Sequence, residues 1–164
     1  MMNDTYPPPS ELSADTQAMT DLTLTVFRVH GALLQWGDKL VEPLGLTSAR
    51  WQMLGAIALT GKALTAPQVA EVMGVTRQGA QKQLNLLLEL GLLESCANPS
   101  HRRSPLYALT PRGDQIYRKA EALWVSKAAE FAAGMSLAQL QTATTTLGAM
   151  LSHLTLPSSP KDLP

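Results

Sequence analysis

The feature that most constrains the fold of this chain is a central stretch, between Thr65 and about Leu90, in which residues that begin and end helices are closely spaced. Thr65 and Gln68 have the spacing of a capping box, which begins a helix, and Gly74 is suited to end that helix. Thr76 follows two residues later and can cap a second helix that runs to about Leu90. Two helices joined by a turn of about three or four residues that contains glycine form a helix-turn-helix. We therefore predict this motif here.

The second of these two helices has two chemically different faces. One face is apolar and suited to a core: Ala80, Leu84, Leu87, Leu88 and Gly91. The opposite face and the amino end carry amides and cations but no carboxylates: Thr76, Arg77, Gln78, Gln81, Lys82 and Asn85. Amides can bridge adenine edges, and cations can bind guanine or phosphate. We predict a helix that reads the major groove of DNA; the alternative is a solvated polar face, although such faces usually include Glu and Asp.

The segment after this helix has the pattern of a stiff hairpin with charge at its tip. Leu92–Ala97 and Leu106–Thr110 are predicted to form two antiparallel strands, and Pro99 and Pro105 restrict the loop between them. The tip carries His101, Arg102 and Arg103. An arginine on such an extension can enter a narrow minor groove, so the pattern predicts a winged helix-turn-helix. An ordinary exposed hairpin with two solubilising arginines is the alternative.

Charge is distributed unevenly along a chain whose net charge is zero. Residues 61–119 carry eight basic and four acidic side chains, whereas residues 1–60 carry three basic and six acidic ones. The basic block is therefore the part that contains the predicted DNA-binding motif. No apolar run is long enough to span a membrane, and no secretory signal is evident. The single cysteine, Cys96, cannot form an internal disulfide, so we expect a cytoplasmic protein.

Long apolar seams near both ends of the chain predict helices that need partners. The first helix is expected from about Asp21 to Val41, and its seam is Leu22, Val26, Val29, Leu33, Trp36 and Leu40. The last seam is Leu137, Leu140, Thr144, Leu147, Leu151 and Leu154, after a capping box at Ser136 and Gln139. The two seams could cover each other or pair with a second copy of the chain. A monomeric helical bundle is the alternative.

These elements predict a mainly α (α+β) protein with six helices and one hairpin. A second helix is expected from Leu46-Thr47 to about Leu59, and a fifth begins at Thr110-Pro111. The predicted domains are a disordered tail (1–17), a dimerisation helix (18–44), a winged helix-turn-helix DNA-binding domain (45–113), C-terminal dimerisation helices (114–155) and a flexible tail (156–164).

In order and spacing, these motifs resemble the MarR family of bacterial transcriptional regulators. The resemblance covers roughly residues 21–154 and is strongest over 46–113. "LTSARWQMLGAIA" resembles the family's second helix, and "TAPQVAEVMGVTRQGAQKQLNLLLELGLLE" is similar to its helix-turn-helix. "NPSHRRSPLYALTPRG" is similar to the family's wing, in which Asp-Pro-x-Asp-Arg-Arg leads to Leu-Thr-x-x-Gly. Arg102 and Arg103 match the arginine pair.

Two departures from the family pattern concern the predicted DNA-binding elements. Asn98 and His101 replace wing aspartates, one of which helps to hold the wing arginine in the family. Gly79 and Gln81 stand in the recognition helix where small hydroxyl or branched residues are common. Glycine inside a helix costs about 1 kcal/mol relative to alanine, so we expect close backbone approach to DNA or to a neighbouring helix there.

The resemblance implies a ligand-responsive repressor that binds duplex DNA as a homodimer formed by its terminal helices. Two recognition helices and two wings would bind a pseudo-palindrome with half-sites roughly 10 bp apart. It also implies a small aromatic or phenolic effector, bound between the dimerisation helices and the winged domain. His30 and Trp51 are candidates to line that site, although a core or interface role for His30 is the simpler interpretation.

The residues do not favour an enzyme, a metal site or a bound cofactor. His30, His101 and His153 lie in separate elements without carboxylates at ligand spacing, and no phosphate loop or nucleophile motif is present. Cys96 is interpreted as a structural or incidental thiol rather than an oxidant sensor. The alternative to a DNA-binding regulator is a winged-helix module that binds other proteins and does not bind DNA specifically.

Overall fold

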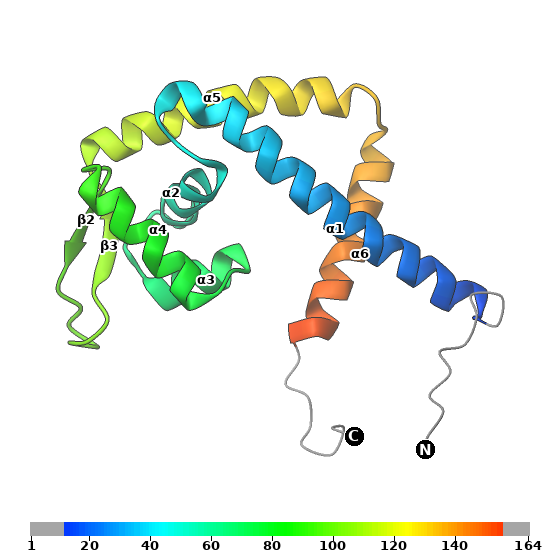
Figure 1. The fold of residues 1–164 in the computed structure, drawn as a ribbon, viewed down its shortest axis with the longest axis horizontal. Helices are drawn as coiled ribbons and strands as arrows, with labels where there is room; N and C mark the ends of the chain where they lie inside the picture. The colour runs from blue at the N-terminus through cyan, green and yellow to red at the C-terminus, as the bar shows by residue number, and fades with distance from the viewer. Residues whose placement is uncertain (1–11, 156–164) are drawn as a thin grey trace, which may run out of the picture. The chain divides into compact units, whose positions relative to one another are not determined.

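The computed structural model describes residues 12–155, and the chain divides into two compact units, Met1–Glu121 and Ala122–Pro164 (Figure 1). The first unit contains the helices α1 (Ala14–Val41), α2 (Ser48–Thr60), α3 (Ala66–Met73) and α4 (Arg77–Glu89), the 3-10 turn η2 (Glu42–Leu44) and the strands β1 (Leu64–Thr65), β2 (Leu93–Cys96) and β3 (Leu106–Leu109). Helix α5 (Pro111–Ala132) begins in this unit and continues into the second, which also contains α6 (Leu137–Thr155). The predicted mainly α class is confirmed.

The helix-turn-helix forms at the residues that the helix caps and Gly74 predicted. The Thr65 hydroxyl accepts a hydrogen bond from the Gln68 amide, and the Gln68 side chain accepts one from the Thr65 amide, which completes the capping box of α3. Gly74 ends α3 with φ of 63°, a left-handed conformation that favours glycine. Thr76 caps α4 by accepting a bond from the Gly79 amide at 3.0 Å. The turn between α3 and α4 is therefore determined by local bonds.

The wing is part of a three-stranded antiparallel sheet with the order β1-β3-β2. Strands β2 and β3 form the predicted hairpin, in which Leu93 pairs with Leu109 and Cys96 with Leu106. The strand β1 was not predicted, because two residues are too few to show an alternating pattern. It pairs Leu64 with Tyr107 and so connects the start of the helix-turn-helix to the wing.

Two hydrogen bonds attach the base of the wing to the residues that follow α4, and a third orders the turn into α5. The Thr110 hydroxyl donates to the Gly91 carbonyl oxygen at 2.8 Å, and Arg112 Nη1 donates to the Leu90 carbonyl oxygen at 3.1 Å. The Gly113 amide donates to the Thr110 hydroxyl at 3.0 Å. A Cβ atom at Gly113 would overlap the backbone carbonyl of Leu92, so the chain can pass there only as glycine. This explains physically why Leu-Thr-x-x-Gly follows the wing.

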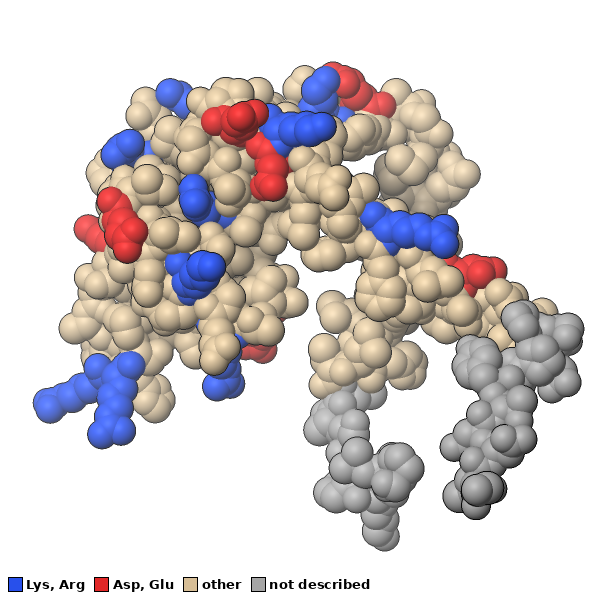
Figure 2. Space-filling view, viewed as in Figure 1, with Lys and Arg blue, Asp and Glu red and all other residues tan. Residues whose placement is uncertain are grey.

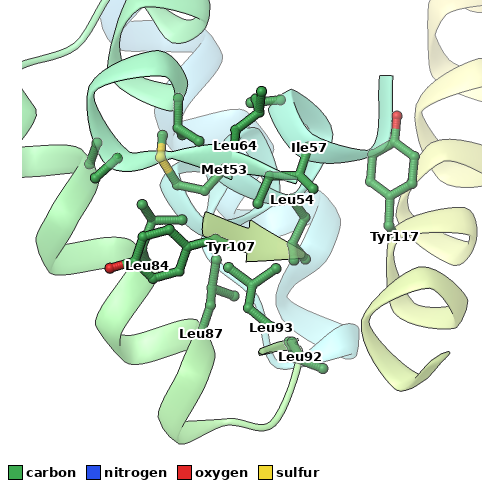
Figure 3. Close-up of a cluster of buried hydrophobic side chains, with 14 of the residues drawn as sticks. Met53, Leu54, Ile57, Leu64, Leu84, Leu87, Leu92, Leu93, Tyr107 and Tyr117 are labelled. Carbon is green, nitrogen blue, oxygen red and sulfur yellow. The ribbon is translucent and has the colours of Figure 1, made fainter. Parts of the chain in front are cut away.

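The core of the first unit lies between α2, α3, α4 and the sheet (Figure 3). Its largest fully buried side chains are Met53, Leu54, Leu84, Leu87, Val41 and Val69. From the spacing of Val69, Val72 and Met73, the sequence predicts that Val72 faces inward, but its side chain is 50% exposed. It lies beside, and not within, the buried stripe of α3, which Ala66, Val69, Ala70 and Met73 define at helical spacing.

Helix α1 begins earlier than its apolar seam suggested. Ser13 caps it by accepting a bond from the Thr16 amide, so residues 14–17, which the sequence predicted to be part of the tail, form its first turn. The other predicted tail residues, 1–11 and 156–164, lie outside the described residues. At its carboxyl end, α1 contacts α2 through Asp38, whose carboxylate accepts a bond from the Ser48 amide at 2.6 Å. Much of the remaining apolar surface of α1 is exposed: Met19, Leu24, Phe27, Val29 and Leu33.

The second unit consists of the later part of α5 and all of α6. The predicted capping box is confirmed, because the Ser136 amide donates to Gln139 Oε1 and the Gln139 amide donates to Ser136 Oγ. No residue of α6 is buried, and its seam is largely exposed: Leu137, Leu147, Leu151 and Leu154. Within residues 12–155, no helix is both long and apolar enough to cross a bilayer.

Candidate nucleic-acid interface

Helix α4 places its apolar residues in the core and its polar residues at the surface. Ala80, Leu84 and Leu87 have no exposed surface, which fixes the rotation of the helix about its axis. The predicted groove-reading residues are accordingly exposed, apart from half-buried Gln81: Thr76, Arg77, Gln78, Lys82 and Asn85. A Cβ atom at Gly79 would lie 3.0 Å from Thr76 Oγ1, so glycine also relieves crowding at the cap. The sequence thus predicted the buried and exposed sides of α4 correctly, except for Gly91, which is exposed and follows the helix.

The wing tip is held by bonds within its own loop. Asn98 Nδ2 donates to the Ser104 carbonyl oxygen at 2.9 Å, and Asn98 Oδ1 accepts from the Ser100 amide at 3.0 Å. Asn98 therefore closes the loop by binding its backbone. The three predicted contact residues of the tip are all exposed: His101, Arg102 and Arg103. Figure 2 shows the cationic side chains that project from the end of the hairpin.

A recess of about 340 Å³ brings the recognition helix and the wing together. Arg77, Gln78 and Gln81 line it from α4, and Arg103 lines it from the wing. A second recess of about 470 Å³ lies along α4, where Gln78, Gln81, Lys82 and Asn85 line it. Seven of the nine predicted DNA-binding residues are therefore grouped together. Six lie in α4 or at its N-cap, and the seventh is Arg103 of the wing: Thr76, Arg77, Gln78, Gln81, Lys82, Asn85 and Arg103.

The cations of this surface are not neutralised within the described part of the chain. Over residues 12–155 the ion pairs are Asp114 with Arg118 and Lys127 with Glu130, both at 2.8 Å. Arg77, Lys82 and the two wing arginines take no part in them. Their charges are available to an external anion, and the long-range attraction of a polyanion depends on such unpaired charges.

One contact in this region was missed by reasoning from the sequence. Gln81 Nε2 donates to Asn85 Oδ1 at 2.8 Å and to the Tyr107 hydroxyl oxygen at 2.7 Å. Gln81 and Asn85 are four residues apart on a helix, so their bond could have been predicted. Tyr107 lies on β3, and its contribution depends on how the sheet packs against α4. The sequence could have indicated it only indirectly: a tyrosine at a core-facing strand position usually has a hydrogen-bond partner for its hydroxyl.

The two residues predicted to bind an effector, His30 and Trp51, differ in their exposure. His30 is exposed on α1, and Trp51 is half-buried against the core. A pocket of about 510 Å³ lies between the end of α2, β3 and the start of α5. It contains Tyr117, whose pKa is raised by burial and by the nearby Glu121 carboxylate. An effector site at His30 and Trp51 remains a prediction.

Neither Cys96 nor the three histidines belong to a cluster of possible metal ligands within residues 12–155. Cys96 is exposed, and its thiol lies 3.7 Å from the Leu106 carbonyl oxygen. Among residues 12–155, no three His, Cys, Asp or Glu side chains come together as metal ligands would. The chemistry that the surface offers is the binding of a polyanion through cations and amides.

Comparison with known proteins agrees with this geometry. Residues 44–104 match the model of the MarR family. An uncharacterized protein of Mycobacterium tuberculosis is 43% identical over 95 residues, which make up 58% of this chain and 65% of that protein. The chain thus spans just under two thirds of the length of the curated relatives that it matches, since one from Mycobacterium bovis gives the same values.

Solved structures share the fold over most of the chain. The Mycobacterium tuberculosis transcriptional regulator MosR, in complex with DNA, is 26% identical with a TM-score of 0.67, and the match covers 82% of this chain and 98% of MosR. CouR from Rhodococcus jostii, bound to p-coumaroyl-CoA, is 21% identical with a TM-score of 0.68, covering 95% of this chain and 100% of CouR. At that identity, the likeness to CouR shows the fold alone.

Proposed function

We propose that this chain, whose residues 44–104 match the MarR family model, is a sequence-specific DNA-binding transcriptional regulator of the cytoplasm and not an enzyme. The observation that carries the proposal is the recess shared by the amino end of α4 and the wing. Arg77, Gln78 and Gln81 meet Arg103 there, on a surface whose cations have no ion pair within residues 12–155. Helix α4 would enter the major groove while the wing follows the adjacent backbone.

Helix α4 and the wing would contribute differently to DNA binding. Gln78, Gln81 and Asn85 offer amides to base edges, and Lys82 and Arg77 offer charge to phosphates or guanine. Arg102, Arg103 and His101 lie at the end of a loop that Asn98 keeps compact. An arginine in that position would sit in the minor groove, where narrow A·T-rich segments have the strongest negative potential.

We infer that the active form is a homodimer. The observation in its favour is the apolar surface that each unit leaves exposed. In the first unit Phe27 of α1 is 68% exposed, and in the second unit Leu137 of α6 is 69% exposed. Large apolar side chains exposed along a helix favour an interaction site, and a second copy supplies a matching surface. Two recognition helices would then bind a pseudo-palindrome with half-sites roughly 10 bp apart.

We further propose that the protein is a repressor and that a small aromatic or phenolic effector releases it from DNA. CouR, which shares the fold, is a protein bound to p-coumaroyl-CoA. His30 and Trp51 are the residues that we propose to test first. Titration of ligands against intrinsic tryptophan fluorescence would detect binding near Trp51, and Trp51→Phe should remove that response.

The first experiment is selection of bound sequences from a random duplex DNA pool, at about 150 mM salt and without ligand. We expect an enriched palindrome whose affinity falls about 10³-fold or more between 50 and 200 mM salt. A folded protein that enriches no sequence would overturn the proposal. The alternative, a winged-helix module that binds other proteins, would then be favoured, because such a module shows neither sequence preference nor steep salt dependence with DNA.

A further inference from the structure

We propose that Tyr107, a buried residue of the wing, positions Gln81 and Asn85 so that the two amides together recognise adenine at one base pair of each half-site. The inference rests on the proposed function, because it concerns how the same surface selects a DNA sequence. Tyr107 itself would not touch DNA. It would act as a positioning residue, through the hydrogen bond that its hydroxyl makes with Gln81.

Tyr107 is held in place by its burial in the core and by its strand pairing. It is 3% exposed, and its backbone pairs with Leu64 on one side and Ser95 on the other. Its ring lies among the core side chains, while its hydroxyl points toward α4 (Figure 3). A hydroxyl held in this way cannot move without disturbing the sheet. The bond to Gln81 therefore transfers the rigidity of the core to a side chain of the recognition helix.

The hydrogen-bonding capacity of the two amides is partly used within the protein. A glutamine amide has two N–H donors. In Gln81 one bonds to Asn85 Oδ1 at 2.8 Å and the other to the Tyr107 hydroxyl oxygen at 2.7 Å. Gln81 Oε1 remains as an acceptor, and Asn85 Nδ2 remains as a donor. Gln81 therefore does not bridge adenine alone, and the two amides share the contact.

The pair can present only one kind of pattern to a base. If either amide turned over alone, like groups would face each other between Gln81 and Asn85, and the bond between them would be lost. If both turn, the Tyr107 hydroxyl can donate instead of accept, and one donor and one acceptor again remain. In the major groove adenine offers an acceptor at N7 beside a donor at N6, whereas guanine offers two acceptors. The pair therefore matches adenine and opposes guanine.

A fixed pair also costs less entropy when it binds. A free glutamine loses rotamer freedom on contact with a base, and that loss weakens binding. Gln81 has already lost this freedom on folding, since it is half-buried between Asn85 and Tyr107. The selectivity of the contact should consequently depend on the hydroxyl of a residue that lies in the core.

The central test is Tyr107→Phe in the full chain, which removes the hydroxyl and keeps the ring. The wild-type protein first defines the binding sequence, and Kd is then measured with adenine and guanine exchanged at each position. We expect the adenine preference to fall about tenfold at one base pair per half-site, with little change of preference elsewhere. Tyr117→Phe, the same change in another buried tyrosine, is the control and should leave every preference intact.

A second set of variants does not depend on the stability of the Tyr107 variant. Gln81→Ala and Asn85→Ala should each lower selectivity at the same base pair, and the double variant should lose little more than either single one. If Tyr107→Phe folds and keeps its full adenine preference, or if the two alanine variants act at different base pairs, the inference is overturned and the proposed function stands. If the wild-type protein has no sequence preference at all, both are overturned.

Discussion

Helices α4 and α6 have similar apolar seams, but the seam of α4 is buried and the seam of α6 is exposed. In α4 the seam residues Ala80, Leu84 and Leu87 are completely buried, because α2, α3 and the sheet surround them. In α6 no residue is buried, although its seam is longer. The difference teaches that helical periodicity identifies the face that must be covered but does not identify what covers it. In the winged domain the cover comes from the same chain; for α6 we propose a second copy.

The largest expected effect on stability comes from comparing a leucine-to-alanine substitution in α4 with one in α6. Leu84→Ala should lower the free energy of unfolding by about 2–5 kcal/mol, because it leaves a cavity in a closed core. Leu147→Ala, at a position that is 42% exposed, should lower it by less than about 1 kcal/mol in protein dilute enough to be monomeric. Urea denaturation at low concentration measures both values. Equal losses would mean that the α6 seam is covered within a single chain.

A comparison of two glycines extends the contrast to the backbone. Gly113→Ala should destabilise the protein by about 1–3 kcal/mol or more, because the new Cβ would meet the Leu92 carbonyl. Gly148→Ala in α6 has no atom within 4 Å of the new Cβ and should stabilise the helix by about 0.5–1 kcal/mol. Thermal unfolding of the two variants gives the signs directly. A Gly113→Ala protein as stable as the wild type would show that the wing base can shift.

The proposed cover of α6 can be tested by placing a charge on the seam. Leu151→Asp should raise the dimer dissociation constant about tenfold or more, because a carboxylate would have to be desolvated at the interface. Ser152→Asp puts the same charge on the next residue, which lies off the seam and is exposed. Sedimentation over a range of concentrations measures both constants. If neither variant changes the association state, a homodimer formed through α6 is excluded.

The smallest effect is expected at the wing tip, which is exposed and has few contacts. Arg103→Ala should weaken binding more at A·T-flanked sites than at G·C-flanked ones, and should reduce the slope of log K against log salt by about 1. Lys119→Ala removes the same charge from an exposed position on α5 and serves as the control. Equal losses on the two kinds of flank would assign Arg103 to phosphate contact alone.

Reasoning from the sequence was most accurate where structure depends on neighbours in the chain. The threonine caps of α2, α3 and α4 and the glycine that ends α3 are confirmed. The start of α1 was predicted seven residues too late, since Ser13 caps a turn that carries little of the seam. The two-residue strand β1 and the outward position of Val72 were missed, because both depend on how elements pack together.

The sequence by itself determined the threonine caps of α2, α3 and α4, the turn of the helix-turn-helix and the charged wing, because these depend on bonds between residues three or four apart. Only the tertiary structure decided which polar side chains are free to act. Tyr107 lies 26 residues from Gln81 in the chain, and their bond exists because β3 packs against α4. That contact is set by the packing of the whole core, since no local pattern brings these two residues together.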